Sequence, residues 1–402
     1  MKTIERKYFL PFVLVTSLFL LWGLAGNMTE TLLCAFKKIM TMSDTETSFI
    51  ESPFYGAYFV IALPAAIFIR KYSYKRGVVL GLILYATGAI LFLPAAMAES
   101  YVFYLFAIYV MASGCSILET TANPYIMSMG SAETATRRLN IAQAFNPVGS
   151  IMGILISKYF ILRDISLNSI SETYAAVGVV LLFIMLVMIF SHMPEGRDTG
   201  VDDSLLSTFV RLFKNKKYSL GVIAQFFYVG AQIGVWSFTI RIVMQELGVV
   251  EADAATIYLI TIIGFCLSRF IYTALMRWIR PTYLLIFGSM MSILATLGVI
   301  FGQGNGMGMV VPLILISFFM SLMFPTIYGE ALGSIATSET PSDVKIGASG
   351  LIMAILGGAV MTPVQALVSD RTDIYTSYGI PLICFVVVLL YALYCSVRKS
   401  VK

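Results

Sequence analysis

The sequence predicts an all-α polytopic membrane protein with 12 transmembrane helices, on three observations. The chain has 402 residues, of which 58% are hydrophobic and only 12% are charged, whereas soluble proteins carry about 25% charged residues. Its mean hydropathy of +0.86 does not suit a soluble protein, which would have to expose large apolar patches. Apolar stretches long enough to cross a bilayer recur twelve times along the chain.

These stretches form two groups of six. Several contain Gly, Pro, Asn or Gln, which a transmembrane helix tolerates where neighbouring helices satisfy its backbone. The first six spans are expected at 9–36, 50–69, 77–97, 101–129, 139–162 and 173–193. The second six are expected at 218–245, 252–276, 282–302, 308–332, 345–369 and 374–397.

The distribution of positive charge predicts the orientation. With the N-terminus in the cytoplasm, the inner segments hold 20 Lys and Arg residues and the outer loops hold five. Because cytoplasmic loops are enriched in Lys and Arg, both termini are expected inside the cell. The net charge of +5 therefore reflects topology, and we expect no nucleic-acid partner. The first inner loop carries Arg70, Lys71, Lys75 and Arg76. These residues are interpreted as a topology signal or as a cytoplasmic latch.

One polar connector divides the chain. Residues 192–217 are rich in charge, so we expect a six-helix bundle at 1–193, a cytoplasmic linker at 194–217 and a second six-helix bundle at 218–402. The inner loop AIFIRKYSYKRGVVLG matches TALMRWIRPTYLLIFG in type and place, which indicates an internal repeat. Two six-span repeats predict the major facilitator fold, with substrate bound near the midplane. A twelve-span carrier of unrelated repeat organisation is the alternative.

Two glutamates lie inside apolar spans. Glu30 and Glu119 would each cost several kcal/mol if ionised at the bilayer centre. Such a group binds a proton, faces a wet cavity or pairs with a cation. A carboxyl group that alternates between these states can couple transport to protons. The alternative is a buried ion pair with Arg241 or Arg269, which would itself be costly.

Amide side chains accompany both acids. Asn27 lies three residues before Glu30, and Asn123 lies four residues after Glu119, so each pair shares a helix face. In the fifth span, Gln143 and Asn146 continue such a stripe. Amides and carboxylates suit the hydroxyl groups of a sugar. The fifth-span amides are also explained as interhelical hydrogen-bonding residues, each worth about 1 kcal/mol.

The seventh span adds aromatic residues to this pattern. Tyr228, Gln232 and Trp236 follow each other every four residues. Aromatic rings can support the apolar faces of a sugar, although residues such as Tyr228, Trp236 and Trp22 are more often packing residues or anchors at the membrane interface. Glu330, near the inner end of the tenth span, is expected to meet basic residues there, and a role in an inner gate is one interpretation.

Other classes of function lack their motifs. The sequence has no GxxxxGK[ST] phosphate-binding loop. Its single histidine and five scattered cysteines do not form a metal-site pattern, and the cysteines are expected to be buried small hydrophobes. We therefore expect neither an enzyme nor a bound cofactor.

Five segments resemble one known family. GNMTETLL, SILETTANPYI, RRLNIAQAFNPVGS, AQFFYVGAQIGVWSFTIR and MFPTIYGEALG are similar to the fucose/proton symporter family, the L-fucose permeases of bacteria, and the similarity runs nearly end to end. The resemblance implies that Glu30 takes up the coupled proton and that Glu119 serves both substrate and coupling. It also implies that Asn27, Gln143 and Asn146 contact the sugar or line the cavity. Where the family carries NNxxD, this chain has GNMTE, so the acid is one methylene longer.

The expected activity is import of L-fucose or a related hexose together with a proton, by alternating access. The expected partners are a sugar, the proton and the lipid bilayer of a bacterial inner membrane, and the protein is expected to be a monomer. The alternatives are uptake of glucose, galactose or an amino sugar, drug efflux by antiport, and a sugar sensor that does not transport. Amide-rich stripes argue against drug efflux, and a connector of about 25 residues is too short for a sensor's output domain.

Overall fold

The computed structural model describes residues 4, 6–39, 51–161, 166–193, 204–335 and 341–399. Of residues 6, 29–38, 51–52, 251–252, 341–342 and 398–399 it describes the backbone alone. All regular structure in these ranges is helical. Twelve segments of the described chain are long and apolar enough to cross a membrane, which confirms the predicted all-α, twelve-span class.

The chain divides by its contacts into two compact units. Unit 1 comprises residues 1–132, 148–208 and 338–353, and unit 2 comprises 133–147, 209–337 and 354–402. Two elements therefore lie outside the group of spans that surrounds them in sequence. Helix α7 (Ala135–Gln143) belongs to unit 2, where it packs on α12 and α15, and α16 (Pro341–Met353) belongs to unit 1, where it packs on α3 and α6.

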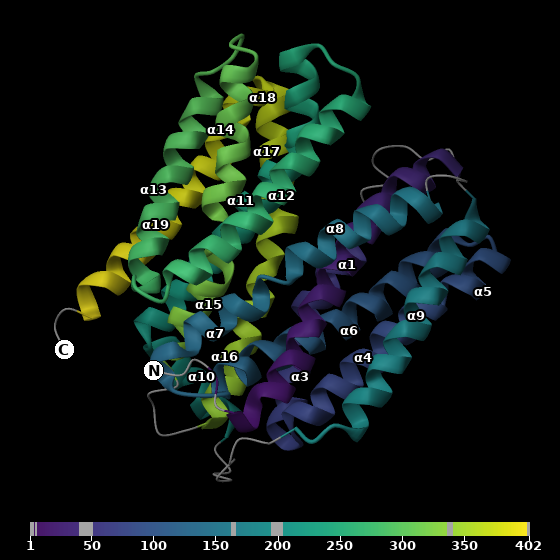
Figure 1. Ribbon diagram of the computed structural model, residues 1–402, viewed down its shortest axis with the longest axis vertical. Helices are drawn as coiled ribbons and strands as arrows, with labels where there is room; N and C mark the ends of the chain where they lie inside the picture. The colour runs from purple at the N-terminus through teal and green to yellow at the C-terminus, as the bar shows by residue number, and fades with distance from the viewer. Residues whose placement is uncertain are drawn as a thin grey trace. The chain divides into compact units, whose positions relative to one another are not determined.

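Unit 1 is a bundle built around α6, which packs against α3 and α4, while α4 also packs against α9 (Figure 1). Its elements are η1 (Arg6–Tyr8), α1 (Phe9–Ile39), α3 (Glu51–Lys71), α4 (Tyr74–Ile90), α5 (Phe92–Met97), α6 (Tyr101–Ser128), most of α8 (Asn146–Ile156), the π-helical η3 (Ser157–Ile161), α9 (Leu167–Phe190) and α16.

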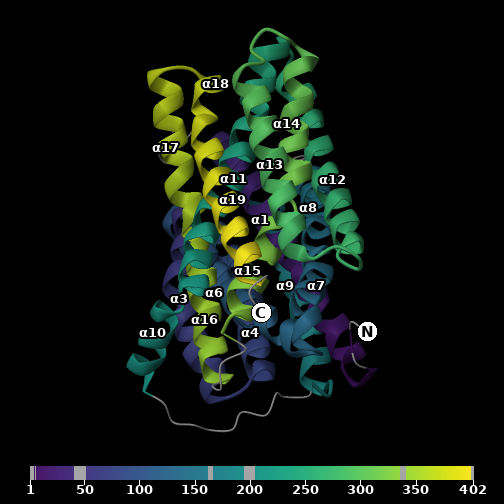
Figure 2. The same cartoon turned by 90° about the vertical axis from the view of Figure 1, so that its left-hand side faces the viewer.

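Unit 2 is built around α11, which packs against α12, α15, α17 and α19, while α13 packs on α14 and α19 (Figure 2). Its elements are η2 (Ala132–Thr134), α7, α11 (Lys216–Leu247), α12 (Glu251–Leu275), α13 (Pro281–Ile300), α14 (Met307–Met320), α15 (Met323–Gly333), η4 (Ala354–Leu356), α17 (Gly357–Arg371), α18 (Ile374–Ser377) and α19 (Gly379–Lys399). Helix α10 (Leu205–Lys214) contains the boundary between the units.

Side-chain caps set several helix starts. The hydroxyl groups of Ser73, Ser100 and Ser166 accept hydrogen bonds from backbone amides three residues on, at the starts of α4, α6 and α9. Such caps satisfy donors that the first turn of a helix leaves unpaired. Asp373 caps α18 in the same way, and hydrogen bonds from the hydroxyl and backbone amide of Thr376 hold the pKa of this carboxyl below its ordinary value.

Five spans of the described chain are interrupted, although their hydropathy predicts continuous helices. The third breaks at Leu91 between α4 and α5, and the twelfth breaks at Tyr378 between α18 and α19. The fifth span breaks at 144–145 between α7 and α8, the tenth at 321–322 between α14 and α15, and the eleventh at η4 between α16 and α17. The fifth and eleventh spans occupy corresponding places in the two groups of six. Interrupted helices at corresponding positions mark the substrate site in transporters built from repeats.

Glycines let two pairs of helices approach closely. A methyl group on Gly149 of α8 would overlap the Leu20 carbonyl oxygen of α1, and one on Gly153 would lie 2.8 Å from the Leu24 carbonyl oxygen. In unit 2, a methyl group on Gly357 of α17 would overlap the Phe226 carbonyl oxygen of α11. Small residues allow such backbone contact between membrane helices. The first span thus packs on the fifth as the seventh packs on the eleventh.

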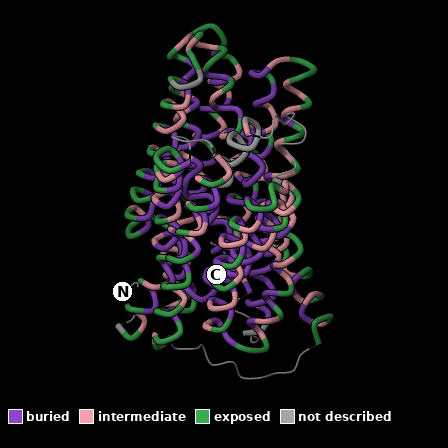
Figure 3. Tube along the Cα trace, turned by 90° about the vertical axis from the view of Figure 1, so that its right-hand side faces the viewer, coloured by how far each residue is buried: buried purple, intermediate pink, exposed green. Residues whose placement is uncertain are grey.

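Exposure alternates with burial along single helices (Figure 3). From Val179 onward the exposed side chains of α9 are large and apolar, and they include Val179, Phe183, Leu186 and Phe190. A soluble protein would bury such residues, whereas lipid tails accept them. Four cysteines are free and buried, as expected, namely Cys115, Cys266, Cys384 and Cys395. The side chain of Cys34 lies outside the described residues.

Candidate functional site

Glu119 is a buried acid of unit 1. It lies on α6, where its side chain is 4% exposed and every residue from Met111 to Met127 is buried. Its polar neighbours are the Asn123 amide one turn on, the Tyr58 phenol and the Cys115 thiol. Among the described residues of unit 1, no Lys or Arg pairs with it. A carboxyl group in such surroundings is tolerable when it carries a proton or meets a ligand.

Aromatic residues surround this acid. The indole N–H of Trp22 donates a hydrogen bond to the Tyr58 hydroxyl, and the Tyr85 hydroxyl donates one to the Leu21 carbonyl oxygen at 2.9 Å. These bonds join α3 and α4 to α1. Trp22 also stacks on Phe19, with ring centroids 5.6 Å apart. The structure therefore supports the packing interpretation of Trp22.

Asn27 lies on the same helix as Trp22. Its side-chain amide donates to the Gly23 carbonyl oxygen at 3.2 Å, one turn back. Gly26, beside it, has no atom within 4 Å of the place where a side chain would begin. Among the described residues, open space thus adjoins Gly26, while Asn27 lies close to Gly153 of α8. Glu30 lies on the backbone of α1, but its side chain is outside the described residues.

The amides of the fifth span flank its interruption. Gln143 is the last residue of α7 and Asn146 is the first residue of α8. Gln143 is 4% exposed, and its backbone carbonyl oxygen accepts a hydrogen bond from Arg269 at 3.1 Å. Within α7, Asn140 donates from its side chain to the Thr136 carbonyl oxygen at 2.9 Å. The structure thus places both predicted amides at a break in a helix, and Arg269 binds a backbone carbonyl group there.

Arg269 is a buried cation of unit 2. It is 3% exposed on α12, and its Nε donates to the Ser321 carbonyl oxygen at 2.6 Å. Its guanidinium lies over the Phe265 ring, 4.6 Å from the centroid, and beside the Tyr228 hydroxyl. The carbonyls that bind Arg269 belong to Gln143 and Ser321, next to the interruptions of the fifth and tenth spans. Among the described residues of unit 2, no acid pairs with Arg269.

Two aromatic residues of the seventh span border this cation. Tyr228 is fully buried and meets Phe324 edge to face. Trp236 is partly exposed, packs edge to face on Phe265 with centroids 5.0 Å apart, and donates to the Ser317 hydroxyl at 3.1 Å. Gln232, one turn before Trp236, is also partly exposed. Unit 2 therefore gathers Tyr228, Arg269 and Trp236, two of which were predicted.

Unit 2 also contains two fully buried glutamines. The side-chain amides of Gln225 on α11 and Gln365 on α17 are buried, and none of their nitrogen and oxygen atoms has a hydrogen-bond partner in the described structure. Gln365 lies against Gly234 of α11. An unsatisfied buried amide is costly and needs an explanation, such as a ligand or water. Gln365 was not predicted, because a single glutamine in an apolar span forms no polar stripe with its neighbours.

Glu330 binds a lysine of its own unit. The Lys217 ammonium group lies 2.7 Å from one carboxylate oxygen of Glu330, and the Thr282 hydroxyl donates to the other at 3.2 Å. Glu330 is 4% exposed. The expectation that Glu330 meets a basic residue is confirmed, and the partner lies at the start of α11.

Known proteins share this architecture and these segments. The Major Facilitator Superfamily model matches residues 8–342. The chain is 39% identical to an L-fucose-proton symporter of Haemophilus influenzae, over 97% of each chain. It is 32% identical to a glucose/galactose transporter of Brucella abortus, over 97% of this chain and 95% of the relative.

The structural comparison agrees with these relatives. The crystal structure of a Major Facilitator Superfamily transporter, FucP, in the outward conformation matches with a TM-score of 0.88 and 32% identity, over 97% of this chain and 99% of that one. These relatives are transporters and not enzymes. The chain belongs to the Major Facilitator Superfamily, and within it to the fucose/proton symporter family.

Proposed function

We propose that this protein imports a monosaccharide, L-fucose or a related 6-deoxyhexose, together with a proton by alternating access. The main observation behind this proposal is the 39% identity to an L-fucose-proton symporter across 97% of both chains. Glu119 supports the proposal chemically, because it is buried with Asn123 beside it and no Lys or Arg among the described residues of unit 1 pairs with it, and a carboxyl group and an amide can hold sugar hydroxyls. No bound cofactor is needed, since the proton supplies the driving force.

In this mechanism Glu30 takes the proton from outside. Neutralising a carboxyl group removes the cost of closing it away from water. Glu119, Asn27 and Asn123 bind sugar hydroxyls from the first group of spans, together with Gln143 and Asn146. Gln232, Tyr228 and Trp236 supply an amide and apolar faces from the seventh span. Release inside the cell then frees the proton and the sugar together.

The division of the chain and its orientation belong to the same proposal. We infer a bundle at 1–193, a cytoplasmic linker at 194–217 and a bundle at 218–402, in a monomer of the bacterial inner membrane with both termini inside. The excess of Lys and Arg in the inner segments supports this orientation. Fusion of green fluorescent protein to the C-terminus should give fluorescent cells, and alkaline phosphatase fused there should stay inactive.

The direct test uses cells that express the protein in a weakly buffered medium. Addition of L-fucose should raise the external pH, because each sugar enters with a proton. Cells that express the Glu119→Gln variant serve as the control. An L-fucose uptake that leaves the external pH unchanged contradicts proton coupling, and the absence of both uptake and alkalinisation contradicts the substrate.

A second substrate has a specific observation in its favour. The identity of 32% to a glucose/galactose transporter covers 97% of this chain. Counterflow in proteoliposomes loaded with L-fucose, tested with labelled L-fucose, glucose and galactose, separates the two. Faster exchange of glucose or galactose than of L-fucose would replace the first assignment.

A further inference from the structure

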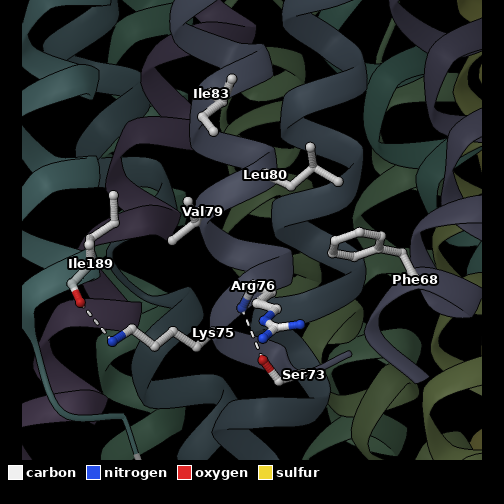
Figure 4. Close-up of a pocket in the computed structure, with 8 residues that line it drawn as sticks. All are labelled: Phe68, Ser73, Lys75, Arg76, Val79, Leu80, Ile83 and Ile189. Atoms are coloured by element: carbon white, nitrogen blue, oxygen red, sulfur yellow. Dashed lines mark hydrogen bonds between the residues drawn. The ribbon is translucent and has the colours of Figure 1, made fainter. Parts of the chain in front are cut away.

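A membrane-facing groove lies at one end of unit 1, far along the chain from the residues assigned to sugar. Its volume is about 470 Å³, and its lining comes from the end of α3, the start of α4 and the end of α9. Figure 4 shows its charged and apolar parts separated, with Lys75 and Arg76 at one end and Val79, Leu80 and Ile83 along α4 beyond them. Phe68 and Ile189 complete the apolar part.

The apolar part is accessible to lipid tails. Ile83 is 42% exposed and Ile189 is 38% exposed, while Val79, Leu80 and Phe68 are partly exposed. All five belong to helices that are long and apolar enough to span a membrane. Their exposed faces therefore meet the acyl chains of the bilayer rather than water.

The lining contains one engaged cation, Lys75, and one available cation, Arg76, while Lys71 lies beside Arg76 without lining the groove. The ammonium group of Lys75 donates to the carbonyl oxygens of Ile189 and Ser191, at 2.7 and 2.9 Å, so Lys75 ties α4 to the end of α9. Arg76 and Lys71 instead lie over the Tyr72 ring, 5.4 and 5.6 Å from its centroid. Among the described residues, neither side chain makes a hydrogen bond or ion pair.

No acidic residue of this part of the sequence neutralises these cations. Between Glu51 and Glu99 the chain contains no Asp or Glu. The first inner loop thus presents fixed positive charge at the mouth of an apolar groove. A molecule that fits both parts carries an anionic group on an apolar chain.

We propose that this groove binds an anionic phospholipid, with its phosphodiester at Arg76 and Lys71 and one acyl chain along Val79, Leu80 and Ile83. The leaflet follows from the proposed orientation, which places the first inner loop at the cytoplasmic surface. Arginine forms paired hydrogen bonds with phosphate oxygens, and basic pockets on the cytoplasmic side of membrane proteins recognise lipid headgroups. A free phosphate would leave the apolar wall unused, and a neutral lipid would leave the cations uncompensated.

The second group of spans supplies a matched control. Arg277 follows the eighth span as Arg76 follows the second, it is exposed, and its guanidinium lies over the Trp278 ring at 5.6 Å. The two arginines therefore share charge, exposure and ring contact. They differ in one respect, since Arg76 lines the groove and Arg277 does not.

The test measures binding of phosphatidylglycerol to the purified full-length protein by native mass spectrometry, with phosphatidylcholine for comparison. Arg76→Gln should weaken phosphatidylglycerol binding about fivefold, the value of one cation at an anionic surface, and Arg277→Gln should leave it unchanged. Leu80→Trp, which fills the groove and keeps the charge, should also weaken it. Thermal unfolding of each variant confirms that it is folded.

Three outcomes overturn the proposal. Equal losses in Arg76→Gln and Arg277→Gln would indicate general surface charge. Equal affinity for phosphatidylcholine would indicate an apolar groove without headgroup recognition. Displacement by soluble glycerol phosphate at the affinity of the lipid would indicate a phosphate site. None of these measurements requires sugar or a proton gradient, so their result is independent of the transport proposal.

Discussion

At the scale of single residues, Arg269 and Glu119, two of the buried charged residues of the described spans, are accommodated differently. Arg269 keeps its charge at all relevant pH values and is therefore held by carbonyl oxygens and aromatic rings. Glu119 has an amide, a phenol and a thiol as neighbours, and no cation in the described part of its unit pairs with it. A carboxyl group can lose its charge, whereas a guanidinium cannot. Glu119 is thus the group that can respond to a proton or a ligand.

Glu119→Gln should weaken L-fucose binding at least tenfold. The substitution keeps the size of the side chain but removes a charge-assisted acceptor, worth about 1.5–3 kcal/mol when it binds hydroxyl groups. Isothermal titration calorimetry on the purified protein in detergent measures the affinity. Glu172→Gln, an exposed acid of α9, is the control. Unchanged affinity in Glu119→Gln would remove this residue from the sugar site.

Some candidate site residues could be identified from the sequence because a charged residue is rare within an apolar span. Glu119 was identified by its charge, and Asn123 by its position one helical turn after Glu119. The hydrogen-bond acceptors of Arg269 could not be predicted from the sequence. They are the backbone carbonyl oxygens of Gln143 and Ser321, and every residue has such a group. Gln365 was also missed, since its unsatisfied amide is visible only when its neighbours are known.

At the scale of helices, the interruptions and the glycine contacts occur together. The fifth and eleventh spans are both broken, and each packs through glycine on the first span of its group of six, α8 on α1 and α17 on α11. Hydropathy located these spans but not their breaks, because Ala144 and Phe145 are as apolar as the residues of an intact helix. The Gly149-x-x-x-Gly153 pattern did indicate close packing.

Gly149→Ala should destabilise the protein by about 1–3 kcal/mol, the usual cost of forcing extra volume into a packed site. Its new methyl group would meet the Leu20 carbonyl oxygen, which cannot rotate away. Gly26→Ala on α1 meets no atom within 4 Å and should be neutral or stabilising, since alanine favours helices. Thermal unfolding in detergent compares the two. Equal stability of both variants would contradict the close contact of α1 with α8.

The Lys217–Glu330 pair makes a second prediction at this scale. Lys217→Met should destabilise unit 2 by about 3 kcal/mol, because it leaves a carboxylate that is 3% exposed without its cation. The double variant Lys217→Met/Glu330→Met should recover most of that loss, since apolar residues of similar size often replace a buried pair without cost. A double-mutant cycle of unfolding midpoints gives the coupling. Additive effects would mean that the two side chains do not interact.

At the scale of the whole molecule, the sequence and the contacts divide the chain differently. Hydropathy and the polar connector predict two consecutive halves, whereas contacts group α7 with the later spans and α16 with the earlier ones. Both exchanged helices are the N-terminal parts of interrupted spans. A sequence pattern shows which residues precede a linker but not which helices lie together, so this exchange could not be predicted. Two groups joined through interrupted spans suit a carrier that rearranges around these breaks.

Such a carrier should accumulate sugar in proportion to the membrane potential. With one proton per sugar, a potential of 100 mV, inside negative, supplies about 2.3 kcal/mol, which corresponds to roughly 50-fold accumulation. Proteoliposomes with a potassium diffusion potential and labelled L-fucose measure this ratio. Glu30→Gln, which has no titrating group at that position, should equilibrate the sugar without accumulation while still exchanging it across the membrane. Glu172→Gln should accumulate as the unaltered protein does. If Glu30→Gln reaches the unaltered ratio, the coupled proton binds elsewhere, and if the unaltered protein ignores the potential, sugar moves without net charge.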